Sequence, residues 1–217
     1  MKSMKSTLLC LTMLGIASTA VAQNEQFVPI LSYRVGPYAA GGSGYFGGTI
    51  DYFNLVNANG GVNGVKMKYE ECETEYNASR GVECYERLKS KHGGASTIEP
   101  LSTGIAYGLL DRVGQDKIPM TTFGYGSANA ADGRVFQWVY PVGTSYWSQA
   151  AAMITYLGQK VGGMDQLKGK KIVDLYHDSA FGKEPLPVFE ALAAKYGFEF
   201  IKIAVAHPGN TQESQWL

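Results

Sequence analysis

Apolar positions recur with the spacing of a strand in some segments and with the spacing of a helix in others. This pattern predicts a succession of strands and helices. Residues 27–33 form a short apolar run typical of a strand. Residues 65–70 alternate between apolar and polar side chains, as a half-buried strand does. Between these runs Phe46, Ile50 and Phe53 recur at helical spacing, so we expect a helix with one buried face.

The same alternation continues with short links between elements. It predicts an α/β fold, a doubly wound parallel sheet covered by helices on both faces. The further elements expected up to residue 140 are a helix at 78–92, a strand at 95–99, a helix at 105–113, a strand at 118–122 and an extended run at 135–140.

A second unit is expected to begin near residue 143. Met153, Leu157 and Val161 share one helical face, which we expect to be buried. A strand at 171–177, a helix at 189–196, a strand at 198–205 and the start of a helix at 209 follow. We therefore expect a first lobe at 23–142 and a second lobe at 143–217, the second one truncated.

The first 22 residues read as a secretory signal. Lys2 and Lys5 precede an apolar run at 8–17, and small residues lead to a cleavage site expected after Ala22. The run is too short for a spanning helix of roughly 20 residues, and the rest of the chain has no second long apolar segment. We expect a soluble mature protein exported to the periplasm.

Net charge and cysteine count limit the class of partner and the role of the cysteines. Lys and Arg together number 19, as do Asp and Glu, so there is no basic excess to suggest a nucleic-acid partner. Cys72 and Cys84 remain after the predicted cleavage, and an even pair in an oxidising compartment favours a structural disulfide. A metal site is the alternative, although two thiols without nearby histidine ligate zinc poorly.

The motifs give little support for catalysis. The stretch Gly42-Ser43-Gly44-Tyr45-Phe46-Gly47 matches a dinucleotide-binding pattern and is expected to lead into a helix, so a nucleotide-dependent oxidoreductase is one alternative function. No nucleophile elbow or metal-binding spacing occurs, and the histidines at 92, 177 and 207 read as solvated or locally bonded. We expect no enzyme activity, no cofactor and no metal.

Ligands in open parallel sheets lie beyond the carboxyl ends of the strands. Those ends carry tyrosines at 33 and 38, and hydroxyl, glycine and aromatic residues at 100–104, 122–127 and 177–181. Ser102 and Thr103 open a helix directly, where they can cap it or hold a ligand carboxylate. The two roles are compatible, because a helix start has several backbone donors.

With these residues in place, the chain resembles the branched-chain amino acid binding proteins, the periplasmic receptors of ABC importers. The similarity covers nearly the whole mature part of the chain. Taken together, the order and spacing of the matching motifs are fairly specific to this family. The residues that carry it are Gly36-Pro37, the stretch 57–64, Ser102-Thr103, the stretch 118–120 and the stretch 178–182.

The resemblance implies a two-lobed type I periplasmic-binding-protein clamp that closes on one small molecule. It implies a monomer that delivers its ligand to the membrane permease of an ABC importer; the alternative is a sensor ectodomain with the same clamp. Cys72 matches a disulfide position of the family, and Cys84 pairs as in one subgroup. Family members are longer than this chain. The ligand-binding residues that it suggests are Tyr38, Ser102, Thr103, Gly124, Tyr125, Gly126, Ser127, Tyr146, Trp147 and Phe181.

One departure from the family bears on the ligand. In amino acid binders the stretch corresponding to 144–148 supplies a carboxylate for the ligand ammonium, and here it reads Thr-Ser-Tyr-Trp-Ser. An ammonium buried without a countercharge is costly. We therefore expect a carboxylate with an apolar or aromatic body rather than a standard amino acid.

Overall fold

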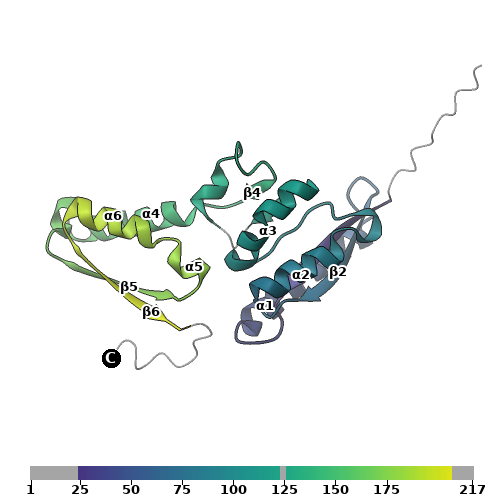
Figure 1. The fold of residues 1–217 in the computed structure, drawn as a ribbon, viewed down its shortest axis with the longest axis horizontal. Coiled ribbons are helices and arrows are strands. Elements are labelled where there is room, and N and C mark those ends of the chain that lie inside the picture. The colour runs from purple at the N-terminus through teal and green to yellow at the C-terminus, as the bar shows by residue number, and fades with distance from the viewer. Residues whose placement is uncertain (1–23, 123–125, 207–217) are drawn as a thin grey trace, which may run out of the picture.

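The computed structural model describes residues 24–122 and 126–206, whose elements form two lobes at opposite ends of an elongated molecule (Figure 1). The predicted signal peptide, the cleavage site after Ala22, His207 and the helix expected from 209 lie outside the described residues. The first lobe contains β1 (Glu25–Ser32), α1 (Ala39–Ala58), β2 (Lys66–Glu73), α2 (Ala78–Leu88), α3 (Thr103–Asp116), β3 (Met120–Thr122) and β4 (Val139–Pro141). The second contains α4 (Tyr146–Lys160), β5 (Lys171–His177), α5 (Ala180–Lys183), α6 (Leu186–Tyr196) and β6 (Glu199–Val205).

The strands of the first lobe run parallel, as predicted. β1 pairs with β2 and β3 pairs with β4. Isolated parallel bridges from Phe27 to Ala95 and from Ile98 to Met120 place the segment 95–98 between β1 and β3. The strand expected at 95–99 is therefore only a pair of bridges, because Gly94 adopts a positive φ of 105° just before it and Pro100 follows it.

The core of the first lobe lies between the sheet and the pair α2 and α3. Phe27 and Leu31 of β1 belong to this buried cluster, with Tyr85 from α2 and Ile105 from α3. The other face of β1 is buried as well, and α1 contacts both β1 and β2. A strand buried on both faces is typical of a parallel sheet between helical layers.

Helix α1 begins earlier than its glycines suggested. It starts at Ala39, so the glycine stretch 41–44 lies inside its first turns and does not precede it. A Cβ atom at Gly42 would lie 2.0 Å from the backbone oxygen of Tyr33, so only glycine allows this close approach. Close packing of helix against strand therefore explains Gly42, and it speaks against the alternative of a dinucleotide-binding loop at 42–47.

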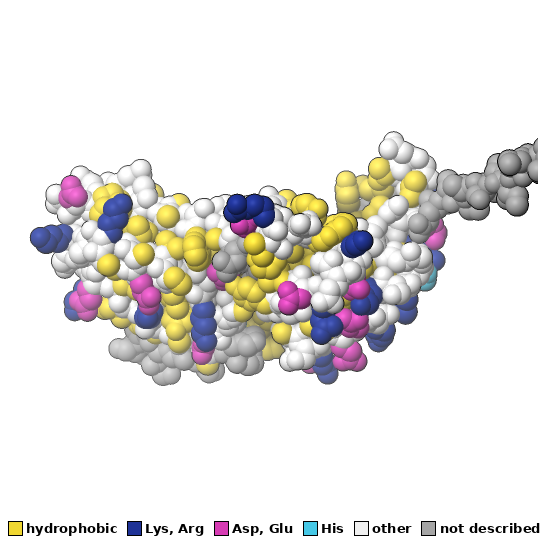
Figure 2. All heavy atoms as spheres, turned by 45° about the horizontal axis from the view of Figure 1, so that its top comes forward, with side chains coloured by type: hydrophobic (Ala, Val, Ile, Leu, Met, Phe, Trp, Pro, Cys, Tyr) yellow, Lys and Arg dark blue, Asp and Glu magenta, His cyan; other side chains and the backbone are white. Residues whose placement is uncertain are grey.

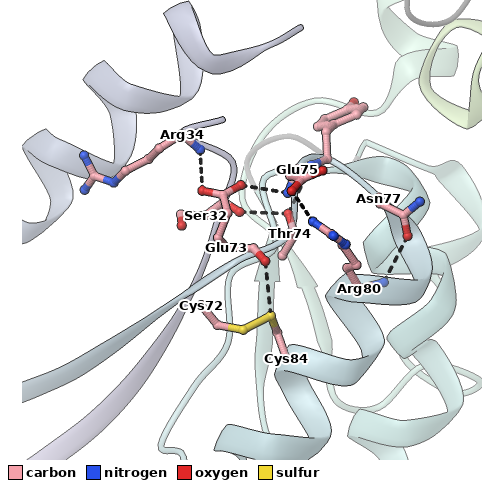
Figure 3. Close-up of polar contacts among 10 residues, drawn as sticks. Ser32, Arg34, Cys72, Glu73, Thr74, Glu75, Asn77, Arg80 and Cys84 are labelled. Carbon is pink, nitrogen blue, oxygen red and sulfur yellow. Dashed lines mark hydrogen bonds and ion pairs between the residues drawn. A yellow bond between two sulfur atoms is a disulfide. The ribbon is translucent and has the colours of Figure 1, made fainter. Parts of the chain in front are cut away.

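The turn from β2 to α2 is held at both ends (Figure 3). The disulfide predicted between Cys72 and Cys84 is present, with 5.8 Å between the Cα atoms. The Thr74 hydroxyl donates to the backbone oxygen of Ser32 at 2.8 Å, and the Asn77 side chain accepts from the first turn of α2. These bonds fix the turn against β1 and α2.

The second lobe has its own sheet and core. β5 and β6 pair in parallel, from Lys171 opposite Glu199 to His177 opposite Val205. The helix face predicted for α4 is wrong. Met153, Leu157 and Val161 are exposed, and the buried stripe consists of Tyr146, Ala150, Ile154 and Gly158. The small residues of this stripe let α4 approach the segment at 164–167, since a Cβ atom at Gly158 would lie 2.4 Å from the Met164 sulfur.

Apolar side chains run across the middle of the face shown in Figure 2, and charged side chains lie towards both ends. On β5, Val173 and Leu175 are 54% and 41% exposed. No helix in the described part of the chain is long and apolar enough to cross a membrane.

Candidate functional site

A pocket of about 430 Å³ lies where the two lobes meet. One wall comes from the end of β1 and the start of α1, and the other from the end of β5 and the start of α5. Most of its lining residues carry aromatic rings. Its lining residues are Tyr33, Pro37, Tyr38, Ala40, Gly41, Tyr76, His177 and Phe181.

A chain of hydrogen bonds crosses this pocket. The Tyr38 hydroxyl lies 2.6 Å from Nε2 of His177, and Nδ1 of His177 lies 2.6 Å from the Ser179 hydroxyl. Tyr38 is the N-cap of α1 and His177 ends β5, so the bond joins one element of each lobe. Of the expected ligand-binding residues, Tyr38 therefore lies in the wall of the pocket.

Tyr76 projects its ring into the same wall from the turn between β2 and α2. Glu75 and Tyr76 both have a positive φ, 52° and 60°, a conformation that non-glycine residues rarely adopt. The ring of Tyr76 lies 5.0 Å from that of Tyr33 and 4.6 Å from that of Tyr38. The strained backbone, held by the bonds in Figure 3, thus completes a cluster of three tyrosines.

Ser102 and Thr103 lie behind this wall, at the start of α3. Both are buried, and the Ser102 hydroxyl accepts from the backbone N–H of Ile105 at 3.3 Å. Ser102 also shares a side-chain hydrogen bond with Tyr76, and the Thr103 hydroxyl lies 3.0 Å from that of Tyr146. The start of α3 therefore anchors one tyrosine from each side of the junction.

Phe181 faces the junction from α5. Its side chain is 47% exposed, and its ring lies 5.5 Å from that of Tyr146. A Cβ atom at Gly182 would lie 2.0 Å from the backbone oxygen of His177, so glycine lets α5 fold tightly over the end of β5. Trp147 is 40% exposed and donates from Nε1 to the backbone oxygen of Glu184 at 3.2 Å.

The predicted loop at 124–127 is only partly described. Gly124 and Tyr125 lie outside the described residues. Gly126 accepts from the backbone N–H of Tyr146 at 2.6 Å, and Ser127 is 1% exposed. The Ser127 hydroxyl has no hydrogen-bond partner among the described residues.

A second pocket, of about 190 Å³, shares His177 and Phe181 with the first. It lies between β5 and the helices α4, α5 and α6, and Asp174 is one of its lining residues. Its remaining lining residues are Tyr146, Gln149, Ala150, Met153, Leu175, Tyr176, Gly182, Pro185 and Phe189.

Burial controls the ionisation of the tyrosines. Desolvation, with smaller contributions from Tyr76 and Glu99, raises the pKa of Tyr33 to about 12. Desolvation likewise raises the pKa values of Tyr38 and Tyr76. Their hydroxyl groups are therefore neutral at physiological pH and can donate hydrogen bonds to an anion. No group of three or more His, Cys, Asp or Glu side chains suited to a metal occurs among the described residues.

Residues 25–217 match the family model described as periplasmic binding protein. The chain belongs to the periplasmic binding protein family. This is a family of binding proteins and not a class of enzymes. No curated protein sequence gives a match.

Solved structures of periplasmic binding proteins and related chains share the fold. A structure described as an ABC transporter permease from the Pseudomonas fluorescens group is 48% identical, with a TM-score of 0.74, covering 89% of this chain and 48% of that one. A branched chain amino acid ABC transporter from Thermus thermophilus with bound valine is 20% identical, with a TM-score of 0.71, covering 84% and 45%. A solute binding protein of an R. palustris ABC transporter, in complex with benzoate, is 18% identical, with a TM-score of 0.72, covering 88% and 51%. The chain thus spans about half the length of these proteins.

The two-lobed type I periplasmic-binding-protein fold expected from the resemblance is therefore confirmed. Sequence reasoning missed His177, Tyr76 and Asp174 as residues of the pockets. The position of His177 at the carboxyl end of a strand was a usable signal, because ligands bind at that edge. Tyr76 gave no comparable signal, since its placement depends on an uncommon backbone conformation.

Proposed function

We propose that this chain is the ligand-binding part of an extracytoplasmic receptor that delivers a small carboxylate to an ABC importer. The aromatic pocket between the two lobes carries the proposal. A ligand there contacts Tyr38 of one lobe and His177 of the other, so its binding energy favours the closed arrangement. Binding coupled to closure is what a delivery receptor needs, because the permease can then distinguish loaded from empty receptor.

The chemistry of the wall favours a carboxylate with an apolar or aromatic body. The rings of Tyr33, Tyr76 and Phe181 offer apolar faces and edges for stacking. Neutral tyrosine hydroxyls and the imidazole of His177 offer hydrogen bonds to the carboxylate. None of the described residues that line this pocket is acidic, although Glu99 lies close enough to Tyr33 to raise its pKa.

The start of α3 supports the anionic end of the ligand. Its backbone N–H groups and partial positive charge favour a carboxylate, and Ser102 and Thr103 position the tyrosines that face it. Within the proposal, Tyr38, Tyr146 and Phe181 contact the ligand directly. Gly126, Ser127 and Trp147 stay in the proposal as contacts suggested by the sequence, as do Gly124 and Tyr125, which lie outside the described residues.

The proposal includes export and a membrane partner. The signal peptide at 1–22 is removed after Ala22, and the mature protein works in the periplasm. Its lobes correspond to residues 23–142 and 143–217. The partner is the importer permease, which receives the ligand from the closed clamp.

A thermal-shift screen of the mature chain tests the binding function. The panel pairs benzoate with benzamide, adds aliphatic acids and amino acids, and includes a nicotinamide dinucleotide. A ligand at 100 times its dissociation constant stabilises the protein by about 2.7 kcal/mol. We expect stabilisation by benzoate or an aliphatic acid and less by the matched amide. Stabilisation by the dinucleotide alone, or by nothing in the panel, would overturn the proposal.

A further inference from the structure

Strand β5 carries an acid on its core-facing side. Ile172, Asp174 and Tyr176 lie on one face of the strand, because successive side chains alternate between faces. Ile172 packs against the core of the second lobe. The carboxylate of Asp174 therefore lies against α4 and α6, where a strand of a parallel sheet ordinarily carries an apolar residue.

This carboxylate has no partner in the described part of the chain. Its Oδ2 atom is buried without a hydrogen bond, and desolvation raises the pKa of the group. No Lys or Arg is found among the described residues that line its pocket. Lys202, the register partner of Asp174 on β6, is paired with Glu190, and Lys183 is paired with Asp178, each at 2.5 Å. Asp174 as a whole is partly buried, but a carboxylate oxygen buried without a hydrogen bond costs free energy, so its presence calls for an explanation.

The Asp174 pocket adjoins the proposed ligand site. The two pockets share His177 and Phe181, so a molecule held between the lobes lies next to the opening of the smaller one. Asp174 and His177 are three positions apart on β5, about 10 Å along an extended strand, and both line the smaller pocket although strand alternation directs them to opposite faces. Met153 and Phe189 contribute apolar side chains to the same lining.

We propose that the Asp174 pocket is a second subsite that binds a cationic amine at the far end of the ligand. This inference rests on the proposed function and specifies its substrate class as carboxylates with a remote amine. The carboxylate lies at Tyr38 and His177, the apolar body crosses Phe181, and the ammonium donates to Asp174. An α-amino acid does not fit this class, because its two charged groups share one carbon and cannot span the separation.

Two ligands of nearly equal shape test the subsite. 4-(Aminomethyl)benzoate carries the remote amine, and 4-ethylbenzoate replaces it with a methyl group. Hydrogen bonds to charged groups contribute enough to expect about tenfold tighter binding of the amine in calorimetric titrations of the mature chain. In Asp174→Asn this preference should disappear. Asp165→Asn makes the same change at an exposed position of the same lobe and should keep it.

The outcomes separate this inference from the proposed function. Equal binding of the two ligands by the wild-type protein, or an unchanged preference in Asp174→Asn, would overturn the subsite and leave the receptor function standing. Binding of other carboxylates but of neither probe would also overturn the subsite. If neither probe nor any other carboxylate binds, the proposed function fails as well. The wild-type comparison needs no variant, so it decides the question even if Asp174→Asn is unstable.

Discussion

The hydroxyl oxygen of Tyr38 lies 2.6 Å from Nε2 of His177, although the two residues are 139 positions apart in the sequence. Neither lobe contains the pair alone, so this hydrogen bond exists only while the lobes are together. Its free energy therefore contributes to the closed arrangement, and a ligand that needs this arrangement benefits from it.

Removal of this bond should weaken ligand binding. Tyr38→Phe keeps the ring and deletes the hydroxyl, and a net hydrogen-bond contribution of about 0.5–1.5 kcal/mol corresponds to roughly two- to tenfold lower affinity. Calorimetric titration with a bound carboxylate measures the change. Tyr52→Phe, at a position of α1 that is 62% exposed, serves as the control and should bind normally. Equal affinities for the two variants would show that the bond does not support closure.

The disulfide between Cys72 and Cys84 should contribute substantially to stability. The cysteines are 12 positions apart, and closing a loop of this size stabilises a protein by about 3 kcal/mol in the chain-entropy model. The double variant Cys72→Ser/Cys84→Ser should therefore lose about that much free energy of unfolding in urea titrations. A reductant should destabilise the wild-type protein and leave the double variant unchanged. An effect on both would point to something other than the disulfide.

Alanine substitutions at Gly42 and Gly44 of α1 should have opposite effects on stability, because only Gly42 is in close contact with another part of the chain. Gly42→Ala places a Cβ atom against the Tyr33 backbone oxygen and should destabilise the fold by about 1–3 kcal/mol. Gly44→Ala meets nothing within 4 Å and should stabilise it by about 0.5–1 kcal/mol, because alanine is the better helix former. Thermal unfolding of the two variants measures the difference. Stabilisation by both would contradict the packing in this structure.

Alkaline pH should destabilise the protein through Tyr33. Its pKa rises from 10.0 to about 12 in the folded state, so folding favours the protonated phenol. The stabilisation is complete below pH 10.0 and is lost as the pH rises towards about 12. Tyr33→Phe cannot ionise, so its stability should fall less over this range than that of the wild type or of Tyr52→Phe. Parallel curves of unfolding free energy against pH would rule out this linkage.

The sequence predicted the elements that have one clear periodicity. The helix predicted from Ile105, Leu109 and Val113 is α3, and the apolar strand predicted at 171–177 is β5. Each segment has a single apolar pattern, so the sequence suggests only one type of element there. The disulfide also followed from an even cysteine count in an exported chain.

The wrong predictions come from segments where the local pattern is ambiguous or where a tertiary contact decides the structure. α4 carries apolar side chains on more than one face, so periodicity could not show that Ala150 and Ile154, rather than Met153 and Leu157, face the core. The glycines at 41–44 read as a break because their close approach to Tyr33 is a tertiary contact. Tyr76 and His177 come together only through the fold, so no local pattern marks them as neighbours of one pocket.

The indole of Trp147 gives the molecule an optical reporter of its own state. It is 40% exposed and donates to the carbonyl of Glu184, whose side chain accepts a hydrogen bond from Tyr107 on α3. Any opening between the lobes separates Tyr107 from Glu184 and changes the polarity around the indole. In a variant whose other two tryptophans, Trp138 and Trp216, are replaced by phenylalanine, its fluorescence emission should therefore follow opening and closure in solution without an attached dye.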